Sequence, residues 1–153
     1  MNQNRRDIMR ITTVLGLAIS AGLIKPTEVF AADWKASVFE AKTLDDVVKA
    51  LGGDKFAVSA DVAISGPDIA ENGAVVPVSV SSKAPKTEFV AILVEKNPNT
   101  MAASFNIPEG TEPNVSTRVK MGGTSNVHAL VKADGKWLIA TKEIKVTLGG
   151  CGG

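Results

Sequence analysis

Cysteine and histidine each occur only once in the 153-residue sequence, as Cys151 and His128. A disulfide framework needs an even number of cysteines, so Cys151 cannot pair within its own chain. Zinc and iron–sulfur sites are equally hard to build, because they take several Cys or His ligands. We therefore expect no metal or other cofactor, and a thiol that is free, bonded to another molecule or chemically loaded.

No apolar run is long enough to form a membrane span. The uncharged stretch Ile11–Ile24 is shorter than the ~20 residues that a transmembrane helix needs. Arg5-Arg6 and Arg10 precede it and Val29-Phe30-Ala31 follows, which is the layout of a secretory signal peptide. The paired arginines resemble the twin-arginine type, with a general secretory leader as the alternative. Residues 1–31 are thus predicted to be a cleaved leader that exports the protein.

Neither basic nor acidic residues are in clear excess. Residues 1–31 hold four of the 17 basic and two of the 16 acidic residues, which leaves 13 and 14 in the mature chain. A nearly balanced charge gives no electrostatic footprint for nucleic acid or for an anionic membrane surface. Residues 32–148 are long enough for one domain with a hydrophobic core.

A short helix is predicted at the start of the mature chain. Thr43 with Asp46 three residues later forms a capping-box pattern, and Gly52-Gly53 marks the end of the helix. The apolar residues between them recur with helical spacing. They are Leu44, Val47, Val48 and Leu51. A preceding helical turn is indicated more weakly around Trp34, Val38 and Phe39.

The rest of the chain alternates with the period of β-strands. Seven runs are expected, at Phe56–Ile64, Ala74–Ser82, Thr87–Glu95, Thr100–Asn106, Asn114–Met121, Thr124–Ala133 and Lys136–Leu148. Gly122-Gly123 and Asp134-Gly135 are typical of tight hairpins. Seven short strands at this spacing predict an all-β fold, an immunoglobulin-like antiparallel β-sandwich with a short N-terminal helix.

The run Phe89-Val90-Ala91-Ile92-Leu93-Val94 is apolar at every position. Such a strand is buried on both faces. One face is expected to pack in the core, and the other is covered either by a partner protein or by the apolar face of the chain's own helix. The pattern does not decide between these two.

Catalytic groups are scarce. His128 lies in the middle of a predicted strand, in Val127-His128-Ala129-Leu130, where a histidine is far more often a packed sheet residue than a base. The adjacent carboxylates Asp45 and Asp46 are explained by the positive end of the helix dipole. No phosphate-binding loop, metal-ligand cluster or dinucleotide fingerprint is present. We therefore expect no catalytic residue and no enzymatic activity of the chain itself.

The segment Gly149-Gly150-Cys151-Gly152-Gly153 is the exception. Four glycines around one cysteine maximise backbone freedom and remove bulk, so the segment is predicted to be a flexible arm. Three residue steps from Leu148 carry the thiol about 10 Å from the sheet edge. A slender arm of this length fits a narrow active-site channel of another protein. Cysteine attacks sulfur electrophiles as the thiolate, and nothing adjacent in sequence activates Cys151, so activation is expected from the enzyme that it visits.

This glycine-flanked cysteine, the stretch Glu71-Asn72-Gly73-Ala74-Val75-Val76-Pro77-Val78 and the twin-arginine-like leader together resemble the SoxY family. Members of that family are the sulfur-carrying subunits of bacterial thiosulfate-oxidising systems. The resemblance implies that Cys151 is the covalent attachment site for sulfur and that Gly149, Gly150, Gly152 and Gly153 form its arm. It also implies a periplasmic protein that forms a heterodimer with a second small β-sandwich, the Z subunit.

The resemblance further implies transient docking to three enzymes. A haem enzyme conjugates the thiol to thiosulfate, a hydrolase releases sulfate, and in some organisms a molybdenum enzyme oxidises the remaining sulfur. The carrier itself binds none of their cofactors. Two other readings of the residues stay open: a binding or structural module that uses Cys151 only for an intermolecular disulfide, and a terminal Gly152-Gly153 thiocarboxylate carrier, which would need ATP.

Overall fold

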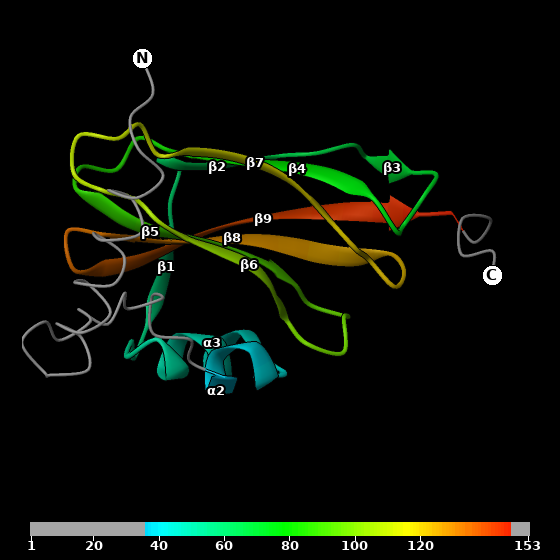
Figure 1. Cartoon of the computed structure of the whole chain (residues 1–153), viewed down its shortest axis with the longest axis horizontal. Helices are drawn as coiled ribbons and strands as arrows, with labels where there is room; N and C mark the ends of the chain where they lie inside the picture. Colours follow the sequence, from blue (N-terminus) through cyan, green and yellow to red (C-terminus); the bar gives the residue numbers. More distant parts are fainter. Residues whose placement is uncertain (1–35, 148–153) are drawn as a thin grey trace, which may run out of the picture. The chain divides into compact units, whose positions relative to one another are not determined.

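A computed structural model describes residues 36–147 of the chain, so the predicted leader at 1–31 lies outside the described residues (Figure 1). The elements are α2 (Ala36–Glu40), α3 (Leu44–Ala50), β1 (Phe56–Val58), β2 (Val62–Ser65), β3 (Ile69–Ala70), β4 (Val76–Ser82), β5 (Thr87–Val94), β6 (Met101–Asn106), β7 (Asn114–Val119), β8 (Ser125–Ala133) and β9 (Lys136–Val146). Within residues 36–147 no helix is long and apolar enough to cross a membrane.

The strands form two layers. The larger sheet has the order β1-β9-β8-β5-β6, with β3 also pairing β9, and the smaller sheet has the order β2-β4-β7. Figure 1 shows the smaller sheet on one side of the larger one and both helices on the other. The pairs β5–β6, β5–β8 and β8–β9 are antiparallel, whereas β1 and β3 run parallel to β9. The predicted all-β sandwich with a short N-terminal helix is confirmed, with two parallel pairs added.

The main core fills the space between the two sheets. Alternate residues of each strand point into it, and many of these side chains are fully buried valines and isoleucines. From the smaller sheet come Val76, Val78 and Val80, and from the larger sheet Val90, Ile92, Val94, Val127, Ala129, Val131 and Ile144. On β9, Leu138, Ala140 and Val146 are partly buried against the same core.

A second apolar cluster covers the outer face of the larger sheet. It joins Ala91 and Leu93 of β5 to Val47 and Val48 of α3. The helix begins as predicted, because the Thr43 hydroxyl accepts a hydrogen bond from the Asp46 backbone N–H at 3.1 Å. The doubly apolar strand is thus covered by the chain's own helices. Its composition gives no argument for a partner protein.

Three details of the predicted strands are corrected. The run Phe56–Ile64 is two strands, β1 and β2, which belong to different sheets, and the two-residue strand β3 was not predicted. Gly122-Gly123 is a crossing between sheets, because β7 pairs β4 whereas β8 pairs β5 and β9. Asp134-Gly135 is the tight β8–β9 hairpin that was expected, with φ of 48° and 72°.

Candidate functional site

The sequence-predicted site begins where the described chain ends. Cys151 and its flanking Gly149, Gly150, Gly152 and Gly153 lie outside the described residues, and so does Leu148, the predicted last residue of the final strand. The structure describes the segment from which they continue, which is the end of β9 and Thr147. The position of this segment limits which surfaces the Cys151 thiol can reach.

Two neighbours hold the end of β9. On one side β3 pairs it in parallel, with Ile69 opposite Lys145 and Ala70 opposite Val146. The backbone N–H of Thr147 donates to the Ala70 carbonyl at 3.1 Å. On the other side the Val146 N–H donates to the Thr124 hydroxyl at 3.0 Å. We call residues 68–73, 121–124 and 145–147 the terminal anchor.

Gly73 lets the backbone of the terminal anchor pack closely. A Cβ at this residue would lie 2.6 Å from the Met121 carbonyl oxygen and 2.8 Å from a methyl group of Val146. The Gly73 carbonyl accepts the Met121 N–H at 2.7 Å, and the Asn72 side chain accepts the Ala74 N–H at 2.9 Å. The stretch 71–78, which carries the family resemblance, therefore packs directly against the base of the predicted arm.

An ion pair lies beside the terminal anchor. The Lys142 ammonium is 2.7 Å from the Asp68 carboxylate, and this hydrogen bond and the lysine charge lower the pKa of Asp68. Asp68 immediately precedes β3, and its carbonyl accepts the Lys145 N–H at 3.0 Å. Because Asp68 is exposed, solvent screens the charge pair, and its role is to position the loop more than to stabilise the fold.

His128 is a packed sheet residue. It is 8% exposed, its Nδ1 is 2.8 Å from the Thr141 hydroxyl, and its Nε2 is 3.8 Å from the Glu95 carboxylate. Burial lowers the pKa of His128, and the charge of Glu95 opposes this. Thr141 lies roughly 20 Å along the strand from Thr147. Because four residue steps separate Thr147 from Cys151 and span at most about 14 Å, His128 is not placed to serve as its base.

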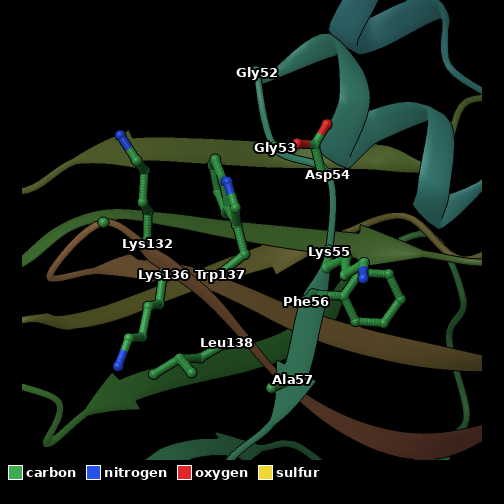
Figure 2. A pocket seen from close by; sticks show the side chains of 11 residues that line it. Gly52, Gly53, Asp54, Lys55, Phe56, Ala57, Lys132, Lys136, Trp137 and Leu138 are labelled. Carbon is green, nitrogen blue, oxygen red and sulfur yellow. The ribbon is translucent and has the colours of Figure 1, made fainter.

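A hollow lies at the other end of β9. It has a volume of about 580 Å³ and is lined by the loop before β1 and by the β8–β9 hairpin. Figure 2 shows Lys132 and Lys136 pointing apart beside Trp137, with Phe56 on the opposite side. Ten residues along a strand, roughly 33 Å, separate Trp137 from Thr147. The hollow is therefore out of reach of a thiol at residue 151 of the same chain.

A metal site is not formed by the described residues. Between residues 36 and 147 no three His, Cys, Asp or Glu side chains are grouped so that they could hold a metal ion. The ion pair of Lys132 with Glu88, at 2.8 Å, and the other ion pairs of this region join exposed or half-exposed residues.

Together these features define a class of protein: a small β-sandwich domain that firmly holds the start of a cysteine-bearing tail. A family model described as "Sulfur oxidation protein SoxY" matches residues 48–151. The chain belongs to the SoxY family. The match includes both the 71–78 stretch and Cys151, on which the resemblance rested.

One solved structure agrees with this assignment. The sulfur carrier protein SoxY from Chlorobium limicola f thiosulfatophilum is 38% identical, has a TM-score of 0.64, and is matched over 74% of this chain and 99% of its own. The superoxide reductase (neelaredoxin) from Ignicoccus hospitalis is 21% identical, with a TM-score of 0.50 over 56% and 80% of the two chains, and shares the fold alone. A search of curated protein sequences returned no match.

The terminal anchor was missed by sequence reasoning. A two-residue strand such as β3 has no periodicity to detect, and its partner is distant in sequence. One available signal was Gly73, because a glycine at the start of a strand pattern can mark a close backbone approach. The stretch 71–78 was noticed as a family feature, without a structural reason for it.

Proposed function

We propose that this chain is a covalent carrier of sulfur intermediates during thiosulfate oxidation, with Cys151 as the attachment site. Membership of the SoxY family supports a carrier role in sulfur oxidation. The single observation that carries the proposal is that the glycine-flanked cysteine follows an anchored strand. The Thr147 N–H donates to the Ala70 carbonyl, and two positions later the sequence Gly149-Gly150-Cys151-Gly152-Gly153 begins.

The steps balance as carrier chemistry. In the first step the thiol loses a proton, and the thiol and thiosulfate together give two electrons to the haem enzyme. A sulfur–sulfur bond forms between them, so that Cys151 carries an S-thiosulfonate. In the second step water cleaves the sulfur–sulfur bond to the terminal sulfonate group. This group leaves as hydrogen sulfate, and a persulfide stays on Cys151. The chain supplies only the thiolate and its position, since the thiolate is the nucleophile toward sulfur. It is therefore a substrate carrier and not an enzyme.

In this proposal the glycine-rich arm moves the thiol, and the β-sandwich holds the start of the arm in place. Glycines at 149, 150, 152 and 153 leave the backbone free and remove side chains that would obstruct a channel. The terminal anchor keeps the starting point of the arm fixed. An arm of this kind swings to several enzymes in turn and needs no large rearrangement of the body.

The test is a set of thiol variants in a reconstituted thiosulfate-oxidising system. Cys151→Ser, or truncation after Gly150, should abolish thiosulfate-dependent oxygen uptake and leave the melting temperature almost unchanged. Ser104→Cys in the Cys151→Ser protein restores an exposed thiol on β6 and should not restore activity. Mass spectrometry of the wild-type C-terminal peptide should show sulfur adducts that a thiol reductant removes. Activity of Cys151→Ser, or a peptide that carries only an intermolecular disulfide, would contradict the carrier mechanism.

The partner subunit and the compartment are part of the proposal. The family supports partner subunits in general, and we propose a heterodimer with a Z-type β-sandwich in the periplasm, exported through the leader at 1–31. Since β5 is covered internally, the heterodimer surface must lie elsewhere on the body. Native mass spectrometry of the untagged protein from periplasmic extract should show a one-to-one complex, and a stable monomer there would contradict it.

A further inference from the structure

Large apolar side chains are exposed at only three places in the part of the chain that the structure describes. They are Val58, 87% exposed, Ile69, 58% exposed, and Val75, 50% exposed. Exposed apolar residues scattered singly are normal on a protein surface. Two of these three, however, belong to the same small region. Ile69 is in the terminal anchor, and Val75 comes two residues after Gly73, the last residue of the anchor segment 68–73.

Ile69 pairs with the end of β9, and Val75 is two residues from Gly73, whose Cβ position lies 2.8 Å from a methyl group of Val146 in β9. Ile69 of β3 is opposite Lys145 of β9, and Figure 1 shows β3 beside the end of β9. Val75 is joined to the Asn72–Gly73 turn, since its N–H donates to the Asn72 carbonyl at 3.3 Å. Their neighbours Ala70 and Val76 are buried, so the apolar side chains alternate between core and solvent at this edge.

The length of the chain beyond Thr147 fixes which surface a visited enzyme must touch. Four residue steps to Cys151 span at most about 14 Å. The mouth of any channel that receives this thiol must therefore lie within that distance of Thr147. An interface of standard size covers about 800 Å² on each partner, equivalent to a disc of about 16 Å radius. A disc of this size centred on Thr147 includes the whole terminal anchor.

We propose that Ile69 and Val75 form a docking collar, an apolar contact that the channel mouth of the visited enzymes covers while Cys151 is inside. The collar rests on the proposed carrier function and adds to it a surface on the body of the protein. The expected occupant is an apolar rim around the channel, because burying these two side chains against apolar groups removes them from water. Such a contact helps the enzyme to bind the carrier and does not act on the chemical step.

The experiment replaces the two residues by threonine, which stays branched at Cβ and has a hydroxyl in place of one apolar branch. Ile69→Thr with Val75→Thr should raise the KM of the reconstituted system for the carrier about tenfold while kcat at saturation stays unchanged. Val75→Thr alone, outside any strand, keeps the test valid if the change in β3 impairs folding. Val58→Thr is the matched control, because Val58 pairs with Ile139 near the other end of β9. Its KM should equal that of the wild type.

Alkylation of Cys151 by iodoacetamide, a reagent that needs no docking, should proceed equally in all variants. An unchanged KM in both collar variants, or an equal rise in Val58→Thr, refutes the collar. If Cys151→Ser is inactive in the same assay, the carrier function stands even when the collar fails. If Cys151→Ser remains active, the carrier function itself is wrong.

Discussion

Replacing Gly73 by alanine should loosen the base of the arm, and the size of the effect follows from the packing around it. The added Cβ would lie 2.6 Å from the Met121 carbonyl oxygen and 2.8 Å from a Val146 methyl group. The methyl group can move aside, but the carbonyl belongs to the backbone. Overpacking of this kind costs about 1–3 kcal/mol, and disturbing the 2.7 Å hydrogen bond from Met121 to the Gly73 carbonyl adds about 1 kcal/mol.

The free energy of unfolding should therefore fall by about 2–4 kcal/mol, measured by urea denaturation. Gly123→Ala is the control, because nothing lies within 4 Å of its Cβ position and its φ is not positive. That variant should change stability by less than about 1 kcal/mol. Hydrogen exchange should also accelerate at the Met121 and Thr147 amides in Gly73→Ala. Equal stabilities of the two variants would refute the steric reasoning.

Two other outcomes are expected. Burial lowers the pKa of His128, so as the pH falls the unfolded chain is protonated at this residue before the folded chain is. The free energy of unfolding should therefore keep its full His128 contribution above pH ~6.5 and decline as the pH falls below that value. His128→Gln should flatten the wild-type loss of unfolding free energy in that range, and an identical slope in both proteins would contradict this. Replacing Arg5 and Arg6 by lysine should stop export of the folded protein, measured as periplasmic accumulation; undiminished export sensitive only to a general secretory block would overturn the twin-arginine prediction.

The sequence predicted best where local chemistry decides the structure. The Thr43–Asp46 cap and the Asp134-Gly135 hairpin depend on a few adjacent residues, and both are present. Six of the seven strand runs were also placed correctly, because the apolar pattern reports which faces are buried. The family resemblance from residues 71–78 and 149–153 was confirmed by the matching family model.

The sequence failed where pairing between distant segments decides. Gly122-Gly123 has the same turn signal in a hairpin and in a crossing, and only the partners of β7 and β8 distinguish them. The Ser59 N–H still donates to the Ile139 carbonyl of β9 at 3.1 Å, and the run 56–64 is then broken by a turn in which the Val62 N–H donates to the Ser59 carbonyl at 3.4 Å and the chain enters the other sheet. The collar and the terminal anchor are products of such long-range contacts.

The place of β9 in the sheet also constrains the order in which the protein can be made. This strand pairs with β8 along its length and with β1 and β3 on its other side, so it joins segments from the beginning and the end of the described region. Contacts between distant segments form slowly and only after both are available. A nascent chain that stops before Lys136 cannot close the larger sheet. Translation products that end before Lys136 therefore lack a closed larger sheet as well as the thiol.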